Sequence, residues 1–175
     1  MLEYKKIEKF LSLRHQCFSY GVDEIVIRLK ENEAYAEYMF IDFDNHEVKN
    51  MSINNFAAQN RYDKCVLVSS ENLLPLALSY FWNFSFISTV INKTESLNSV
   101  TEWLLCVNGG RKLKCDLLHE KYLTYSELYF LEQYLAGENI YTISATLNKK
   151  QKTIYNYRKS IAVKMGLKRL ENLFK

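Results

Sequence analysis

Two kinds of hydrophobic pattern alternate along the first two thirds of the chain. Compact apolar runs, typical of strands that are covered on both faces, are separated by stretches whose apolar residues recur at helical spacing. Because parallel strands need long crossover connections, this alternation predicts a parallel sheet with helices on its faces. The strand candidates lie at 7–13, which is the weakest, and at 38–43, 64–70 and 84–91, and the helix candidates lie at 17–29 and 97–107.

The last third of the chain shows only helical spacing. Thr124 and Glu127 form the sequence pattern of a capping box at the start of one helix, and Gly137 is a natural end for it. The apolar segment 140–147 is too short for a helix that is stable alone, so we expect it to pack against its neighbours.

A longer helix is predicted at 151–165, with a last short helix at 167–174. Gly166 separates the two. The longer helix places its apolar residues on one stripe and leaves its other faces to polar and basic residues. The stripe consists of Ile154, Tyr157, Ile161 and Met165.

A polar stretch separates the two patterns. It opens with Gly109 and Gly110 and lacks strong apolar periodicity as far as Lys121. We therefore expect an α/β domain at 1–110, a linker at 111–121 and an all-α domain at 122–175.

Composition excludes several classes of protein. With 48% hydrophobic and 25% charged residues, the 175-residue chain is ordinary for a globular protein. No apolar run approaches the roughly 18 residues of a membrane-spanning helix, and the charged N-terminus lacks the apolar stretch of a signal peptide. We therefore expect a cytoplasmic protein with no membrane partner.

The four cysteines form no CxxC pair and the three histidines lie far apart, which favours buried reduced thiols over a zinc site. Since no Gly-rich phosphate loop or nucleophile motif is present, we expect neither an enzyme nor a bound cofactor or metal.

Charge is distributed unevenly along the chain. Residues 1–121 carry 14 Lys and Arg against 16 Asp and Glu, whereas residues 122–175 carry 9 against 4, giving the net charge of +3. The segment 147–169 contains eight Lys or Arg and no Asp or Glu. Such a segment is either a solvated helix surface or a surface that binds an acidic partner. Its short helix, tight turn and longer basic helix also match the geometry of a DNA-binding helix-turn-helix unit.

The C-terminal part of the chain resembles the LuxR-type helix-turn-helix regulators of bacteria, also called the NarL or FixJ class. Lys150 stands where this family has the serine that caps the recognition helix, and Tyr157 replaces a histidine, so base preference does not carry over. The matching positions are Leu123, Thr124, Glu127, Leu131, Gly137, Ile143, Leu147, Thr153, Ile154, Arg158, Ile161, Lys164, Met165, Gly166 and Leu167.

The resemblance implies a four-helix unit with its third helix in the major groove and double-stranded DNA as its partner. The expected DNA-binding residues are Lys149, Lys150, Lys152, Thr153, Tyr155, Asn156, Arg158, Lys159 and Lys164. Phosphate contacts are expected from Arg158, Lys159 and Lys164, with Lys149 and Lys150 beside the backbone, and base-edge contacts from Lys152, Tyr155 and Asn156. In the last helix, the stripe of Leu167, Leu170, Leu173 and Phe174 serves either dimerisation on DNA or the core of the domain.

The first domain partly resembles a receiver, the phosphate-accepting domain that often precedes LuxR-type units. Asp42 would be the phosphoacceptor, with Asp44 as the less favoured choice. Ser69 or Ser70 and Lys93 stand where receivers keep a hydroxyl residue and a lysine.

The acidic pair with which a receiver holds Mg2+ is missing. Receivers carry this pair after the first strand, and residues 12–16 contain no carboxylate. The segment 30–37 is also short for a second strand and helix. We therefore expect a shortened receiver-like domain with Asp42 as a vestigial phosphoacceptor, similar to the phosphorylation-independent enterobacterial regulators of fimbriae and acid resistance. Its aromatic segment 76–86 is either core packing, which we favour, or a partner-binding surface.

The leading hypothesis is a sequence-specific DNA-binding transcription regulator that acts without phosphorylation, as a homodimer or with a partner regulator. One alternative is a response regulator switched by phosphorylation of Asp42. The other is a protein-interaction regulator that no longer binds DNA.

Overall fold

The chain combines a parallel sheet and its helices with a C-terminal group of helices. The computed structural model describes residues 16–31, 38–44, 65–108 and 122–174, and the strand candidate at 7–13 lies outside them. The elements are α1 (Gln16–Glu31), β1 (Met39–Asp42), β2 (Cys65–Ser69), α3 (Leu74–Asn83), β3 (Ile87–Asn92), α4 (Leu97–Asn108), α5 (Tyr125–Leu135), α6 (Ile140–Thr146), α7 (Gln151–Lys164) and the 3-10 helix η3 (Leu170–Phe174). We call α1 to α4 with the strands the sheet unit, and α5 to η3 the helical unit.

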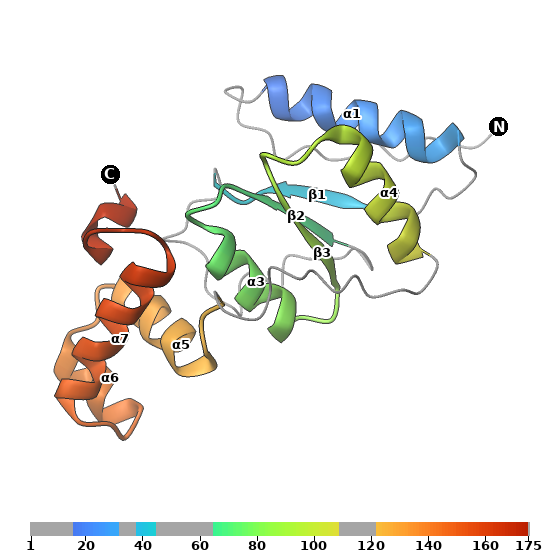
Figure 1. Cartoon of the computed structure of the whole chain (residues 1–175). Helices are drawn as coiled ribbons and strands as arrows, with labels where there is room; N and C mark the ends of the chain where they lie inside the picture. The colour runs from blue at the N-terminus through green and yellow to red at the C-terminus, as the bar shows by residue number, and fades with distance from the viewer. Residues whose placement is uncertain (1–15, 32–37, 45–64, 109–121, 175) are drawn as a thin grey trace.

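The sheet is parallel, in the order β1-β2-β3. Helices α1 and α4 pack together on one face, and α3 lies on the other face, toward the helical unit (Figure 1). This arrangement confirms the α/β architecture and the three stronger strand candidates. Each strand is covered on both sides, as their continuous apolar runs indicated.

Alternating residues of β2 enter two different cores. Cys65 and Leu67 join the core on the α3 side, whereas Val66 joins the core beneath α1 and α4. In β3 this alternation is shifted by an irregularity of register, because Cys65 pairs with Ile87 but Val66 pairs with Thr89.

The helical unit begins and ends its helices with the residues that the sequence indicated. Thr124 caps α5 and forms both hydrogen bonds of a capping box with Glu127. Gly137 and Gly166 follow α5 and α7 at φ values of +86° and +65°, a left-handed conformation that glycine adopts at little cost. No helix in the described part of the chain is long and apolar enough to cross a membrane.

The last helix differs from the prediction. It begins at Leu170 rather than at residue 167, and it is a 3-10 helix. Leu170 is buried in the core, and Leu167 and Leu173 pack against that core. Leu170 therefore serves intramolecular packing, whereas Leu167 and Leu173 are only partly buried, so dimerisation stays a prediction for them. The side chain of Phe174 lies outside the described residues.

One hydrophobic core runs from the sheet unit into the helical unit. It contains Leu76 and Tyr80 of α3 together with Leu123, Leu128 and Ile161. The aromatic segment 76–86 therefore contributes mainly to the core, although Trp82 remains 57% exposed. The domain boundaries expected at residues 110 and 121 fall among residues that are not described, so they stay a prediction.

Candidate nucleic-acid interface

Helix α7 has one buried face and one exposed polar face. Ile154 and Ile161 are fully buried in the core. The exposed face is formed by Lys152, Tyr155, Asn156 and Lys159, at the spacing of residues that share one side of a helix. No Asp or Glu occurs in α7. The exposed face is therefore positively charged and offers amide and phenol groups between its cations.

Two more exposed lysines lie at the N-terminal end of α7. Lys150 is the N-cap residue, and its side chain makes no capping hydrogen bond. Before it, Asn148 adopts the left-handed conformation at φ 50°, which asparagine tolerates better than most residues. The Ser144 hydroxyl donates to the carbonyl of Lys149 at 2.6 Å and so fixes the turn between α6 and α7. Lys149 and Lys150 thus stand beside the backbone N–H groups at the positive end of α7, where anions are favoured.

Arg158 and Lys164 make intramolecular ion pairs instead of joining the exposed face. Arg158 pairs with Glu171, and its guanidinium lies 5.8 Å from the ring centre of Tyr134. Lys164 lies 2.6 Å from the carboxylate of Glu127. Both side chains were expected to contact DNA phosphates. The sequence did not reveal that each of them has an acidic partner within the chain. The two ion pairs join α7 to other elements of the helical unit, Arg158 to η3 and Lys164 to α5. Thr153, which was also expected to contact DNA, is half-buried.

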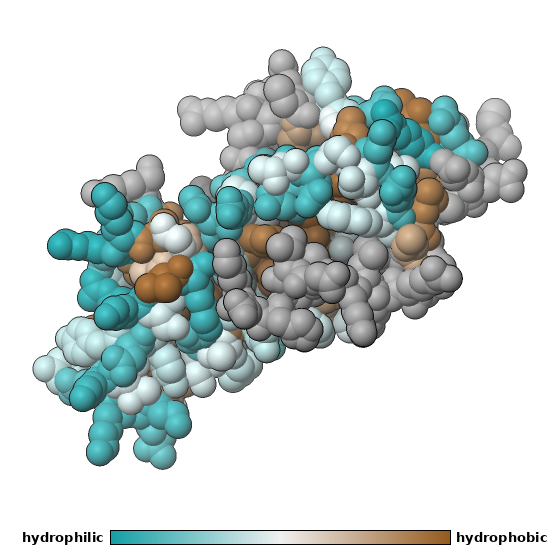
Figure 2. Space-filling model, viewed as in Figure 1, coloured by the Kyte–Doolittle hydropathy of each residue, from teal (hydrophilic) through white to brown (hydrophobic). Residues whose placement is uncertain are grey.

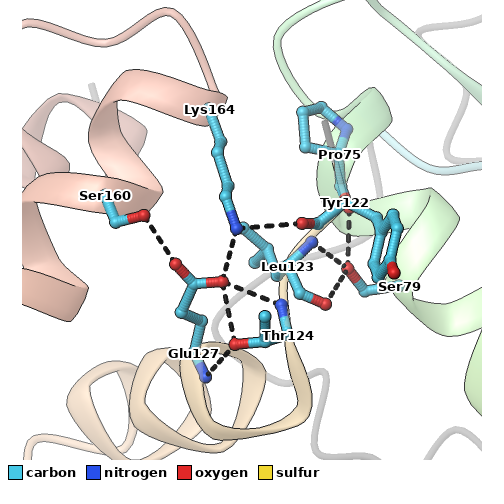
Figure 3. Close-up of polar contacts among 8 residues, drawn as sticks. All are labelled: Pro75, Ser79, Tyr122, Leu123, Thr124, Glu127, Ser160 and Lys164. Atoms are coloured by element: carbon cyan, nitrogen blue, oxygen red, sulfur yellow. Dashed lines mark hydrogen bonds and ion pairs between the residues drawn. The ribbon is translucent and has the colours of Figure 1, made fainter. Parts of the chain in front are cut away.

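Glu127 is the centre of this intramolecular network (Figure 3). Only 4% of the residue is exposed. Its carboxylate accepts hydrogen bonds from Lys164, from the Ser160 hydroxyl at 2.6 Å and from the backbone N–H of Thr124 at 2.8 Å. Burial alone would raise the pKa of Glu127, but the hydrogen bonds from Lys164, Ser160 and Thr124 outweigh burial and lower it. The carboxylate therefore stays ionised and joins α5 to α7.

A second charged cluster lies at the carboxyl ends of the strands. The Lys93 ammonium, just after β3, lies 2.6 Å from Asp42 and 2.7 Å from Asp44. Asp44 also accepts a hydrogen bond from the backbone N–H of Ser70 at 2.9 Å. The Ser69 hydroxyl donates to the carbonyl of Ser70. The structure thus brings together the residues that suggested a receiver, with Lys93 between the two carboxylates.

Lys93 supplies the positive charge at this strand edge. Partial burial would lower the pKa of Lys93, but hydrogen bonds and charge interactions with Asp42 and Asp44 outweigh it, so the pKa is raised. Among the described residues, no group of His, Cys, Asp and Glu is arranged to hold a metal ion. Cys65 and Cys106 are free, and burial raises the pKa of the Cys65 thiol to about 12.

Sequence reasoning missed the partners of the buried polar residues. Glu127, Ser160 and Lys164 are separated by up to 37 positions, so only the fold reveals that they meet. Ser79, which bonds Leu123 across 44 positions, gave no signal in the sequence.

Comparisons with known proteins give a curated relative and several solved structures, which include two of the RcsB response regulator. The relative is the uncharacterized protein YqeH of Escherichia coli K12, 28% identical over 153 residues that span 85% of this chain and 71% of YqeH. A structure of the RcsB response regulator of Salmonella typhimurium is 17% identical with a TM-score of 0.39, covering 91% of this chain and 92% of that one. RcsB of Salmonella enterica serovar Typhimurium bound to promoter rprA, in the presence of phosphomimetic BeF3-, is 14% identical with a TM-score of 0.37, covering 89% of this chain and 92% of that one. Both TM-scores are low, and neither likeness bears on the function of this chain.

A protein-family comparison covers most of the sheet unit. The family described as EcpR N-terminal domain matches residues 13–106, which is more than half of the chain. The match includes the parallel sheet, the helices on both of its faces and the cluster of Lys93 with the two aspartates. The chain therefore belongs to the family of proteins with an EcpR N-terminal domain.

Proposed function

We propose that this protein is a LuxR-type DNA-binding transcription regulator whose helix α7 enters the major groove. The observation that carries the proposal is the exposed face of α7, which presents Lys152, Tyr155, Asn156 and Lys159 without an acidic residue. A buried opposite face and a preceding short helix are what a recognition helix requires. Figure 2 shows hydrophilic side chains extending from the end of the molecule that the helical unit forms.

The exposed residues divide into two groups by their chemistry. Lys149, Lys150 and Lys159 bind phosphates, because flexible ammonium groups at a helix N-terminus and on its flank suit the backbone of DNA. Lys152, Tyr155 and Asn156 read base edges, since amide and ammonium groups form hydrogen bonds there. Arg158 and Lys164 orient α7 through their ion pairs and do not touch DNA.

The sheet unit is, in this proposal, a shortened receiver that works without phosphorylation. In doubly wound folds with the strand order 2-1-3-4-5, the last three strands are consecutive neighbours. The strands β1, β2 and β3 are consecutive neighbours in the same way. The absence of any carboxylate in residues 12–16 supports a mode of action without phosphorylation, because receivers hold the Mg2+ that phosphoryl transfer needs with an acidic pair at that place.

We further propose that the regulator acts as a homodimer or with a partner regulator in the cytoplasm. Leu170 does not provide the contact, because it is buried in the protomer's own core. The symmetry of the bound DNA distinguishes the two assemblies. A homodimer reads two half-sites that are related by two-fold symmetry, whereas a pair formed with another regulator reads two different half-sites.

Binding to duplex DNA across a series of salt concentrations tests the main proposal. Replacing Lys159 with Met removes one phosphate contact, so the slope of log affinity against log salt flattens by about 0.9. The loss of affinity is the same on all duplexes. Asn156→Ala instead changes which base is preferred, at a cost of about 1–3 kcal/mol on the best site.

Lys30→Met on α1 is the matched control, because it removes the same charge from an exposed residue of the sheet unit. Its salt slope is expected to equal that of the wild type. If Lys159→Met and Lys30→Met have equal effects, α7 is not the DNA-binding helix. Failure of the wild type to bind any duplex at low salt, together with capture of another regulator, supports the alternative of a protein-interaction regulator.

Phosphorylation is tested by incubation with acetyl phosphate and Mg2+, followed by intact mass. We expect the mass to stay unchanged. A gain of one phosphoryl group that disappears in Asp42→Asn establishes the alternative response regulator, while its loss only in Asp44→Asn moves the acceptor to that residue.

A further inference from the structure

Segment 122–124, which we call the junction segment, lies between the sheet unit and the helical unit (Figure 3). Its middle residue, Leu123, donates its backbone N–H to α3. The Leu123 N–H donates to the Ser79 hydroxyl at 2.7 Å, and the same hydroxyl lies 3.1 Å from the Leu123 carbonyl. Ser79 is fully buried. A single side chain of the sheet unit thus satisfies the Leu123 N–H at the start of the helical unit.

The position of this hydroxyl within α3 is unusual for a helix-interior serine. Such a residue ordinarily bonds back to the carbonyl four positions earlier, which for Ser79 is that of Pro75 at 2.8 Å. Here the hydroxyl also reaches across to another element. Since Leu123 is itself buried, its N–H would have no access to water if Ser79 did not accept its hydrogen bond.

The neighbours of Leu123 continue the connection into the helical unit. The Tyr122 carbonyl accepts a hydrogen bond from Lys164 of α7 at 3.1 Å. Thr124 donates from its N–H and from its hydroxyl to Glu127, which also binds Lys164. The three residues of the junction segment are therefore tied to α7, α3 and α5 respectively.

Two further contacts lie beside these hydrogen bonds. The rings of Trp82 and Tyr122 are 6.3 Å apart between centroids. Near the N-terminal end of α3, Gly166 of the helical unit lies close to Asn72. A methyl group added to Gly166 would lie 3.5 Å from the side-chain oxygen of Asn72. Both ends of α3 and its preceding loop thus face the helical unit, and the shared core fills the space between them.

We propose that Ser79 fastens the helical unit to α3 so that both units move as one rigid body. A displacement of α3 is then transmitted through the junction segment, Glu127 and Lys164 to the orientation of α7. The inference concerns the free protein, and it stands whether or not α7 binds DNA.

Rotational correlation times from 15N relaxation of the full chain test the proposal directly. In the wild type, amides of α1 and α4 and amides of α5 and α7 are expected to report one common correlation time. Two different times in the wild type overturn the proposal, and this outcome needs no variant.

Ser79→Ala removes the hydroxyl while leaving a small residue in its place. Hydrogen exchange of the Leu123 amide is expected to speed up about tenfold or more, because its buried donor loses its acceptor. The correlation time of α5 and α7 should become shorter than that of α1 and α4.

Thr101→Val on α4 is the matched control. Thr101 is buried and its hydroxyl likewise donates to the carbonyl four residues earlier, that of Leu97 at 2.8 Å. Within the described part of the chain, it makes no hydrogen bond to the helical unit. Its correlation times should match those of the wild type. Equal exchange rates at Leu123 in Ser79→Ala, Thr101→Val and the wild type contradict the role given to Ser79.

Discussion

At the scale of single residues, Lys93 stabilises the two aspartates at the carboxyl ends of the strands. Its ammonium pairs with Asp42, which is nearly buried, and with Asp44. Replacing Lys93 with Met leaves these two carboxylates next to each other without a cation. We expect the free energy of unfolding to fall by about 1–3 kcal/mol, less than for a fully buried pair because Lys93 is partly exposed. Urea unfolding measures this change, and Lys168→Met, at an exposed position, is the charge-matched control, with an expected effect within about 0.5 kcal/mol. Equal effects of the two variants would contradict a structural role for Lys93.

Glu127 makes the stability of the helical unit depend on pH. Because its folded pKa is lowered from the ordinary 4.5, its stabilisation is complete above that value and is lost as pH falls through the folded pKa. At neutral pH, Glu127→Gln should lower the free energy of unfolding by about 1–3 kcal/mol, since Lys164 loses its anion. The difference between the wild type and the variant should shrink below about pH 4.5. Unfolding curves at neutral and acid pH check this, and a difference that stays constant with pH would exclude the carboxylate as its source.

Residues with local partners could be predicted from the sequence, and residues with distant partners could not. The capping box of Thr124 and Glu127 spans three positions, so its pattern was readable and the structure confirms it. The pairing of Glu127 with Lys164 depends on how α5 and α7 pack. The family resemblance therefore placed Lys164 at the DNA, whereas the fold pairs it with the buried Glu127.

At the scale of elements, α7 lacks a side-chain cap at its first turn. Lys150 has the extended backbone of an N-cap residue but makes no capping hydrogen bond. Replacing Lys150 with Ser places a hydroxyl where it accepts a hydrogen bond from the backbone N–H of Thr153. We expect a gain of about 1 kcal/mol in the free energy of unfolding, together with weaker DNA binding because a cation is lost.

Lys149→Ser separates these two effects. It removes the same charge one position earlier, where a hydroxyl does not cap α7, so DNA binding should weaken similarly without any gain in stability. Equal thermal stabilities of the two variants would mean that the first turn of α7 gains nothing from a serine.

The elements themselves followed largely from the hydrophobic pattern. Continuous apolar runs gave the three strands, because buried parallel strands are apolar on both faces. The pattern did not reveal the register shift between β2 and β3. As a result, Ile87 lies in the core on the α3 side of the sheet, whereas Ile91 lies in the core beneath α1 and α4. It also did not reveal that the chain after Gly166 continues without helical structure until Leu170, since the apolar spacing of 167–174 suits either outcome.

At the scale of the whole molecule, an uneven charge distribution coexists with a shared core. The net charge is −2 over residues 1–121, from 14 cations and 16 anions, and +5 over residues 122–175, from 9 and 4. Such an asymmetry is typical of two units with different partners. The core nevertheless runs from α3 through Leu123 into the helical unit, so we expect two surfaces of different charge on one cooperative structure.

Leu76→Ala tests whether this shared core is cooperative. Leu76 lies on α3 and is almost completely buried in the core that also contains Ile161 of α7. The substitution should lower the free energy of unfolding by about 2–5 kcal/mol. Because both units contribute to one core, hydrogen exchange of the most protected α7 amides should show the same loss as the fluorescence of Trp82 and Trp103, which lie in the sheet unit. Val163→Ala, at an exposed position of α7, is the control and should change both probes by less than about 0.5 kcal/mol. A loss seen by fluorescence but absent from α7 would show that the helical unit unfolds independently of α3.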